Sequence, residues 1–398
     1  MLTIDSVYRA KRALEGVARK TDVIYAPKLC PGTELYLKTE NLQVTGSFKV
    51  RGAYYKMTCL SEEEKARGVV ACSAGNHAQG VALAAKKNGI KAVICLPDGA
   101  PISKVEATKS YGAEVCLVEG VYDDAYQKAL QLRDEKGYTF LHPFNDEEVI
   151  AGQGTIALEI MEQLPDVDAV IVPIGGGGLI SGIAYTIKTL NPRVKVYGVE
   201  ASGAPSMKNA LKEGSLATLS SVSTIADGIA VKQPGDLTYE LCNKYVDEIV
   251  TVTDDEISAA ILALMETQKL VTEGAGAVAV AAAMFNKVDL TGKKTVCLLS
   301  GGNIDVTILS RVISRGLLMS GRNCQLRIEL VDKPGQLKNV SRIIADLGGN
   351  VTSVRHERSN EGSDVNGCYL RIVLETRNFE HIEQIRKALQ AEGFKLID

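Results

Sequence analysis

The sequence has no tryptophan, only four histidines and no long apolar run. A membrane-spanning helix needs about 20 consecutive apolar residues, and no segment approaches that length. Charged residues interrupt the first 25 positions, so we expect neither a membrane span nor a signal peptide. The shortage of histidine argues against a metal site built from several imidazoles.

An excess of positive charge is also missing. The 398 residues include 45 Lys and Arg against 48 Asp and Glu, a formal net charge of −3. A nucleic-acid-binding protein needs a basic face, so we expect no nucleic-acid partner. With 45% hydrophobic and 23% charged residues, the composition is that of a globular protein, and the length suffices for two or three domains.

The nine cysteines form no recognisable framework. They are scattered along the chain and include no C-x-x-C pair. Secreted disulfide-stapled domains space their cysteines densely, and zinc sites usually cluster their ligands in the sequence. We therefore predict nine free thiols and a cytoplasmic location.

Between residues 69 and 320, short β-branched runs alternate with longer helical patterns. The short runs are apolar throughout, which is typical of parallel strands covered by helices on both faces. Alternation of this kind predicts a doubly wound α/β fold. The predicted strands are 35–37, 69–72, 92–95, 115–118, 169–174, 194–199 and 295–299, and helices are predicted over 6–19, 78–88 and 179–190.

The pattern changes near residue 320. The remaining chain follows the order βαββαβ, which is the ferredoxin-like split βαβ unit. We therefore expect a large unit over 1–320 and a small one over 325–398. The elements predicted for the small unit are 326–330, 336–347, 351–358, 369–375, 379–392 and 394–397.

Three predicted strands end in polar or glycine-rich loops, namely 73–77, 175–178 and 300–303. The carboxyl ends of the strands in an open α/β sheet share one edge, and ligands bind there. The loop at 175–178 consists of Gly175, Gly176, Gly177 and Gly178, which precede a helix. Their exposed backbone N–H groups and the helix dipole favour a phosphate, although strand–helix packing alone also calls for glycine.

A dinucleotide site is a rival interpretation of the glycine loop, because the next strand ends in an acid, Glu200. The G-x-G-x-x-G pattern fails, however, since Ser181 stands at its last glycine position. Lys49 offers a different chemistry. It lies between Phe48 and Val50, and a desolvated lysine deprotonates readily and attacks a carbonyl to form a Schiff base. Most lysines in such a position are simply solvated.

Together these motifs resemble those of the fold-type II pyridoxal-phosphate enzymes, whose two-lobed fold is that of the tryptophan synthase β chain. The resemblance is to the threonine dehydratase and serine racemase branch. It covers residues 1–320, with a small lobe at roughly 50–150 inserted in the large one. The matching segments are 45–53, 73–77, 151–155, the four glycines, 226–228, 272–276 and 300–303.

The resemblance implies a role for each matching residue. Lys49 would hold pyridoxal 5′-phosphate as a Schiff base and remove the α-proton of the substrate, with Phe48 packed beside the cofactor. Asn76 would bond the ring hydroxyl, the four glycines would hold the phosphate, and Ser300 would face the pyridine nitrogen. The substrate would lie on the loop Ser73, Ala74, Gly75, Asn76 and His77, with Ser73 either binding its carboxylate or only capping a helix.

The implied reaction is the β-elimination and deamination of L-threonine to 2-oxobutanoate and ammonia, and of L-serine to pyruvate. Serine racemases carry Ser where this chain has Ala74, and that hydroxyl supplies a proton to the second face of the substrate. We therefore expect poor racemisation. A racemase, a β-replacing enzyme, a catalytically degenerate amino-acid sensor and, last, a nicotinamide-dependent dehydrogenase remain the alternatives.

Two further sites follow from the resemblance. Glu200, Ala204 and Ser206 match positions where some relatives hold a cation, and Ser206 replaces an Asp of the divalent-binding relatives. Fewer charges favour a monovalent cation or none. The alternative role for Glu200 is a salt bridge at the strand end.

The tail resembles an ACT domain, a small-molecule sensor. An amino acid such as isoleucine or valine, or AMP, would act as effector near Asp332, Pro334, Gly335, Leu337 and Asn350. The alternative is a dimerisation module without a ligand. A homodimer or homotetramer is implied, and the choice between isoleucine synthesis and threonine breakdown stays open.

Overall fold

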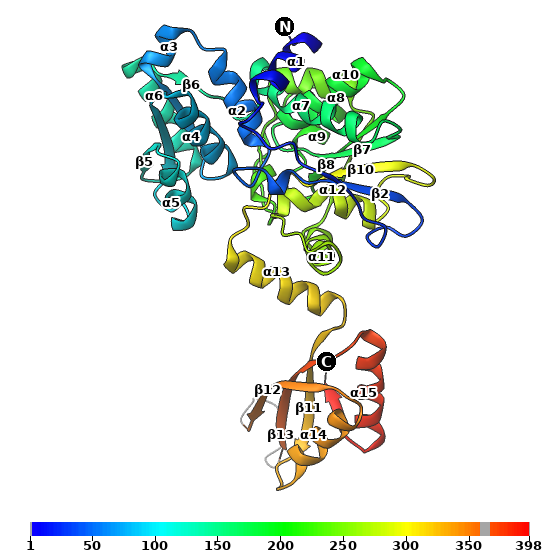
Figure 1. Ribbon diagram of the computed structural model, residues 1–398. Coiled ribbons are helices and arrows are strands. Elements are labelled where there is room, and N and C mark those ends of the chain that lie inside the picture. Colours follow the sequence, from blue (N-terminus) through cyan, green and yellow to red (C-terminus); the bar gives the residue numbers. More distant parts are fainter. Residues whose placement is uncertain (1, 359–366, 398) are drawn as a thin grey trace. The chain divides into compact units, whose positions relative to one another are not determined.

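The structure is a computed structural model that describes residues 2–358 and 367–397 (Figure 1). The chain forms two compact units, Met1–Val306 and Thr307–Asp398. Within the described residues, no helix has both the length and the apolar character needed to cross a membrane. All nine cysteines are free thiols, as the sequence predicts.

A six-stranded sheet forms the centre of the large lobe. Its order is β1-β2-β10-β7-β8-β9, and every pair is parallel except β1 with β2. The central strands β7, β8 and β10 are almost entirely buried, because helices cover both faces of the sheet. The strands are β1 (Val23–Tyr25), β2 (Glu34–Lys38), β7 (Ala169–Pro173), β8 (Lys195–Ala201), β9 (Glu248–Val252) and β10 (Lys294–Leu298).

Helices pack on both faces of this sheet. On one face, the apolar sides of α7 (Glu147–Gln163) and α8 (Gly178–Leu190) form the main core with β7, β8 and β10. On the other face, α12 (Gly274–Met284) contacts four strands and is buried almost throughout, which its alanine-rich sequence permits. The remaining large-lobe elements are α1 (Ile4–Ala13), η1 (Glu40–Leu42), α9 (Ser206–Glu213), η2 (Asp227–Ile229), α10 (Asp236–Tyr245), α11 (Asp254–Ala263) and η3 (Leu264–Gln268).

The small lobe contains a second parallel sheet, of order β5-β4-β3-β6. Helices α2 and α4 pack together on one side of it, and α6 packs on β3 and β4. The small lobe's elements lie together on one side of the large lobe in Figure 1. They are α2 (Lys49–Thr58), α3 (Glu62–Arg67), β3 (Val69–Cys72), α4 (Asn76–Asn88), β4 (Ala92–Pro97), α5 (Ile102–Ser110), β5 (Glu114–Val118), α6 (Tyr122–Lys136) and β6 (Thr139–Phe140).

The C-terminal unit has the predicted βαββαβ order. Its antiparallel sheet runs β12-β13-β11-β14, and one face packs on two helices through alternating apolar residues. The elements are β11 (Asn323–Val331), α14 (Gln336–Asp346), β12 (Asn350–Glu357), β13 (Gly367–Glu375), α15 (Phe379–Ala391) and β14 (Lys395–Ile397). Helix α13 (Val306–Met319) precedes them and groups with this unit by its contacts.

The first helix is shorter than the sequence predicts. The pattern favours a helix over 6–19, whereas α1 ends at Ala13 and turns follow. Gly16 adopts a left-handed φ of 73°, which interrupts a helix. The other predicted strands and helices agree with the structure to within a few residues at each end.

Candidate functional site

The three predicted loops do not share one sheet edge: 175–178 and 300–303 follow strands of the large sheet, whereas 73–77 follows β3 of the small-lobe sheet. Hydrogen bonds also join the segment before α2 to the loop after β10. Phe48 N donates to the Ser300 carbonyl oxygen at 3.1 Å, and Ser47 forms an antiparallel bridge with Gly301. Gly46 has a φ of 70°, and a Cβ there would lie 2.2 Å from Oδ1 of Asn303. A side chain at position 46 would therefore separate the two loops.

Lys49 is the first residue of α2, and its amine reaches the turn that contains Pro143. Its Nζ donates to the Pro143 carbonyl oxygen at 2.9 Å and lies 5.3 Å from the centroid of the Phe48 ring. Burial lowers the pKa of this amine to about 8, although the nearby Glu273 carboxylate opposes the shift. A larger unprotonated fraction near neutral pH is what a nucleophilic or basic lysine requires.

Asn76 connects three loops at the site. Its Nδ2 donates to Oε1 of Glu273 at 2.6 Å, and its Oδ1 accepts from Nδ2 of Asn303 at 2.8 Å. The same Asn303 amide also donates to the Thr45 carbonyl oxygen at 2.8 Å. Asn76 is therefore held in one orientation from both sides. Ser300 belongs to the same loop as Asn303 and is buried. Its hydroxyl donates to the Ala275 carbonyl oxygen at 3.2 Å.

Glu273 is a site residue that sequence reasoning did not single out. Burial raises the pKa of its carboxyl group to about 7, the charge of Asp227 adds to this, and the Asn76 hydrogen bond opposes it. Its backbone N–H also donates to the Gly301 carbonyl oxygen at 3.1 Å. The available signal was an isolated acid in the small-residue stretch 272–276.

The glycine loop between β7 and α8 is packed by Phe144. A Cβ on Gly176 would lie 2.3 Å from the Phe144 ring, and one on Gly178 would lie 2.8 Å from the Phe144 Cα. Gly177 caps α8 with a φ of 93°, which favours glycine. The packing alternative considered above is thus real, but the first backbone N–H groups of α8 still lack partners within the helix and suit an anion.

The turn that carries Phe144 brings Lys49 close to the glycine loop, because Pro143 accepts the Lys49 hydrogen bond. His142 holds this turn: its Nδ1 accepts from the backbone N–H of Asn145 at 2.8 Å and of Phe144 at 3.3 Å. Burial and the Lys49 charge lower the pKa of His142 to about 4, so the ring stays neutral and can accept. No motif in the sequence indicates this role.

In the loop after β3, Gly75 faces open space, whereas Ala74 and His77 pack toward the small lobe. Oγ of Ser73 accepts from the Gly75 backbone N–H at 3.1 Å, and a Cβ on Gly75 would meet nothing within 4 Å. Ala74 packs at the margin of the small-lobe core. Nε2 of His77 lies 2.9 Å from the Leu141 carbonyl oxygen, and burial lowers the pKa of this ring to about 3. His77 therefore serves the interior of the small lobe.

An ion pair joins the two lobes beside these loops. Nζ of Lys104, from α5, lies 2.6 Å from Oδ2 of Asp227, from η2. Asp227 is also the residue whose charge raises the pKa of Glu273. The ion pair therefore links α5 of the small lobe to the residue whose charge acts on Glu273.

The three residues expected to hold a cation lie together at the end of β8. Both carboxylate oxygens of Glu200 accept backbone N–H groups at the start of α9, from Met207 at 2.8 Å and Lys208 at 2.9 Å. Burial raises the pKa of Glu200 to about 7. Ala204 and Ser206 are buried beside it, and the Ser206 Oγ has no hydrogen-bond partner among the described residues.

The expected effector residues lie on the loop between β11 and α14, in the first turn of α14 and at the start of β12. Asp332, Pro334 and Gly335 are exposed, and Gly335 caps α14 with a φ of 92°. Leu337 is 43% exposed. The side-chain amide of Asn350 donates to Oε2 of Glu375 at 2.8 Å.

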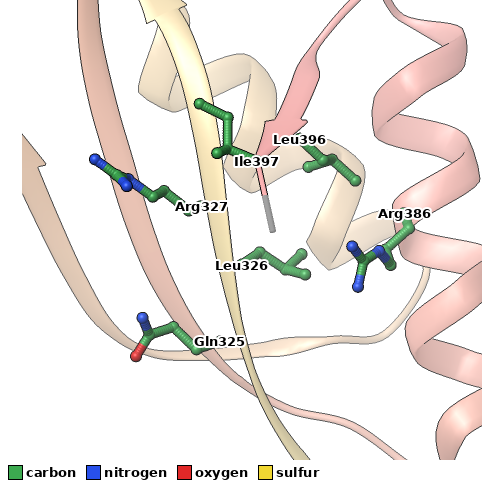
Figure 2. A pocket seen from close by; sticks show the side chains of 6 residues that line it. All are labelled: Gln325, Leu326, Arg327, Arg386, Leu396 and Ile397. Carbon is green, nitrogen blue, oxygen red and sulfur yellow. The ribbon is translucent and has the colours of Figure 1, made fainter. Parts of the chain in front are cut away.

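A hollow of about 240 Å³ opens elsewhere in the same unit (Figure 2). Arg386 reaches it from α15, and Arg327 and Gln325 reach it from β11. Figure 2 shows the guanidinium groups of Arg327 and Arg386 on opposite sides of β11, so they do not form one anion site. The remaining lining residues are Leu326, Leu396 and Ile397.

Comparison with known proteins finds one family match in the N-terminal part of the chain and another in the C-terminal part. Residues 14–301 match the family described as pyridoxal-phosphate dependent enzyme, and residues 325–393 match the ACT domain. The L-threonine ammonia-lyase of Thermotoga maritima is 51% identical over all of this chain and 99% of its own length. Threonine deaminase isoform 2 of Solanum lycopersicum has a TM-score of 0.75 and 40% identity, covering 79% of this chain and 88% of its own. Maize serine racemase has a TM-score of 0.75 and 36% identity, covering 80% and 98%.

Proposed function

The chain belongs to the pyridoxal-phosphate-dependent enzyme family and carries a C-terminal ACT domain, and on that basis we propose that it deaminates L-threonine to 2-oxobutanoate and ammonia. L-Serine, which yields pyruvate, is the proposed second substrate. The observation that carries the proposal is the buried Lys49 amine, which one turn of chain joins to the glycine loop.

The residues at the site fit the cofactor. The N-terminus of α8 suits its phosphate, the Lys49 amine suits its aldehyde, and the buried Ser300 hydroxyl suits its ring nitrogen. When bound, pyridoxal phosphate supplies an electron sink for the charge that develops at the substrate Cα. A hydroxyl at Ser300 carries no charge, which suits a reaction whose carbanion character is brief.

In the proposed mechanism, Lys49 Nζ takes the proton from the substrate Cα, a role that its depressed pKa supports. The Ser73 hydroxyl and the N-terminus of α4 bind the substrate carboxylate. Asn76 is positioned for the cofactor by Glu273 and Asn303. Loss of the β-hydroxyl leaves an enamine, whose hydrolysis gives 2-oxobutanoate and ammonia.

A steady-state assay tests both the activity and its regulation. We expect 2-oxobutanoate from threonine, and a change in rate when one effector among isoleucine, valine and AMP is titrated. A rate unaffected by all three would favour the dimerisation module. Effector binding with no turnover would favour the catalytically degenerate sensor.

Ala74 distinguishes deamination from racemisation. We expect D-serine to form from L-serine at least about a hundred-fold more slowly than pyruvate, because a positioned acid contributes roughly 10²- to 10⁴-fold and alanine has none. Chiral chromatography of the products measures the ratio. Ala74→Ser is expected to raise the share of D-serine, and comparable rates of D-serine and pyruvate formation in the unmodified protein would contradict the proposal.

For Glu200, Ala204 and Ser206 we propose a monovalent cation, supported by the unpartnered Ser206 hydroxyl beside a single buried carboxylate. Potassium at 100 times its dissociation constant would stabilise the fold by about 2.7 kcal/mol. Thermal unfolding in potassium and in tetramethylammonium at equal ionic strength measures this. Ser206→Asp is expected to shift the preference to divalent ions, and equal melting temperatures in both salts would exclude the site.

We also propose a cellular location and an oligomeric state, which depend on the whole chain and not on one site. Nine free thiols support a cytoplasmic location, where thiols stay reduced. A homodimer or homotetramer is proposed because ACT domains usually pair. Sedimentation of the full chain measures the assembly directly.

A further inference from the structure

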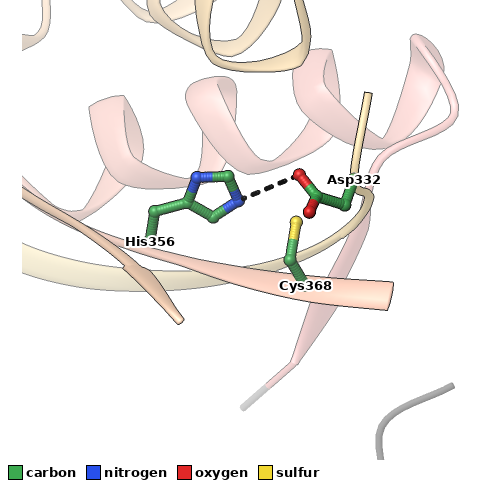
Figure 3. Close-up of side chains that lie close together, drawn as sticks. All are labelled: Asp332, His356 and Cys368. Atoms are coloured by element: carbon green, nitrogen blue, oxygen red, sulfur yellow. Dashed lines mark ion pairs between the residues drawn. The ribbon is translucent and has the colours of Figure 1, made fainter. Parts of the chain in front are cut away.

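Three chemically different side chains of the C-terminal unit meet at one end of its sheet. Asp332 follows β11, His356 lies on β12, and Cys368 lies on β13. A carboxylate oxygen, an imidazole nitrogen and the thiol sulfur all lie within 4.8 Å of one another (Figure 3). Nε2 of His356 is 3.9 Å from Oδ1 of Asp332. Within residues 2–358 and 367–397, no other trio of His, Cys, Asp or Glu side chains comes together in this way.

The strand register explains why residues so far apart in the sequence meet. His356 pairs with Leu370, which shares a sheet face with Cys368 two residues earlier. His356 and Cys368 are therefore diagonal neighbours on one face, within reach of each other. Asp332 comes directly after the last residue of β11, opposite the start of β13.

We propose that Asp332, His356 and Cys368 bind one zinc ion. Sulfur, nitrogen and oxygen together form a donor set that suits Zn²⁺, and three protein ligands leave a fourth position for water or another ligand. Zinc bonds of about 2.0–2.3 Å place tetrahedral ligand atoms roughly 3.3–3.8 Å apart. The ligand atoms already lie within 4.8 Å of one another, so they need to approach only slightly. The side chains of His356 and Asp332 are 41% and 35% exposed and can move, while Cys368 is buried in the core.

Arg358 is a charged neighbour that competes with the ion. Its Nε lies 3.0 Å from Oδ2 of Asp332, and its side chain is 70% exposed. An exposed pair of this kind is worth about 1 kcal/mol or less. It also uses only one carboxylate oxygen, which leaves Oδ1 facing His356. Removing the guanidinium is therefore expected to strengthen zinc binding.

The site is distinct from the catalytic lysine and lies beside the loop expected to bind an effector. Asp332 belongs to that loop, whereas His356 and Cys368 belong to the sheet. A bound zinc ion would therefore tie the loop to β12 and β13. Zinc binding is measured directly and needs no turnover, so it stands or falls separately from the proposed deamination.

Zinc titration of the full chain carrying its cofactor tests the proposal. The protein is first treated with a chelator, zinc is added, and bound metal is counted by elemental analysis after gel filtration. We expect one zinc ion per chain, displaceable by a chromophoric chelator that reports the affinity. His356→Ala and Cys368→Ser are each expected to weaken binding at least about tenfold, and Arg358→Ala to strengthen it.

Cobalt and a second cysteine provide the controls. Cobalt bound to a thiolate gives a charge-transfer absorption, which we expect in the unmodified protein and not in Cys368→Ser. Cys324→Ser changes another buried cysteine of the same unit and is expected to bind zinc normally. Because His356 is exposed, its variant keeps the test valid if Cys368→Ser fails to fold. Zinc binding unchanged in His356→Ala, or absent from the unmodified protein, would overturn the proposal.

Discussion

A Lys49→Ala variant is expected to lose threonine deamination by roughly 10⁴-fold or more. Alanine removes both the amine that holds the cofactor and the base that takes the Cα proton, and a general base alone contributes roughly 10²- to 10⁴-fold. Release of 2-oxobutanoate measures turnover, and the visible absorption of the Schiff base measures cofactor attachment. Both should disappear together.

Lys56 offers a matched control on the same helix. It forms half-buried ion pairs with Asp146 and Glu148 and has no role in the proposed mechanism, so Lys56→Ala is expected to keep its activity. Borohydride reduction of the unmodified protein should leave the cofactor on the peptide containing Lys49. If Lys49→Ala turned over threonine within tenfold of the unmodified rate, the proposed role of Lys49 would be wrong.

The second large effect concerns the stability of the charged core behind Lys49. Arg51 is 1% exposed and donates to both oxygens of Glu40 and both oxygens of Glu159, at 2.7–2.9 Å. Nζ of Lys38 adds a second cation, 2.6 Å from Oε2 of Glu159. Arg51→Met leaves two buried carboxylates short of a partner, which we expect to destabilise the large unit by about 3–5 kcal/mol.

Denaturant unfolding of the cofactor-loaded chain measures this loss, with the dichroism of the bound cofactor reporting on the large unit alone. Arg133→Met is the matched control, because Arg133 pairs only with the exposed Asp134, and its loss should cost less than about 1 kcal/mol. Adding Glu40→Gln to Arg51→Met should recover part of the stability. A double variant with no recovery would show that packing, and not uncompensated charge, causes the loss.

Arg51 also anchors the helix that carries Lys49. It lies two residues after Lys49 on α2, and its partners come from η1 and α7 of the large lobe. The charged core thus anchors the start of α2 against the large lobe, while α2 itself packs on α4 of the small lobe. Lys49 is therefore presented from the helix that joins the two lobes.

Local sequence pattern predicted the secondary structure correctly where neighbouring residues alone determine it. The apolar runs predicted the strands, and Ser61 and Glu64 form a local capping box at the start of α3. The βαββαβ tail was also predicted correctly, because its elements alternate clearly. The helix that stops at Ala13 shows where local pattern fails, since a single left-handed glycine outweighs a favourable periodicity.

The sequence by itself determined the type of fold, the family and the candidates Lys49 and the four glycines, because periodicity and short motifs are properties of neighbouring residues. Only the tertiary structure decided which side chains meet. Asn76 and Glu273 are 197 residues apart in the chain, and Arg51 reaches Glu159 across 108. Asp332, His356 and Cys368 meet through strand pairing. Such partners are chosen by the packing of whole sheets and helices, which no local pattern records.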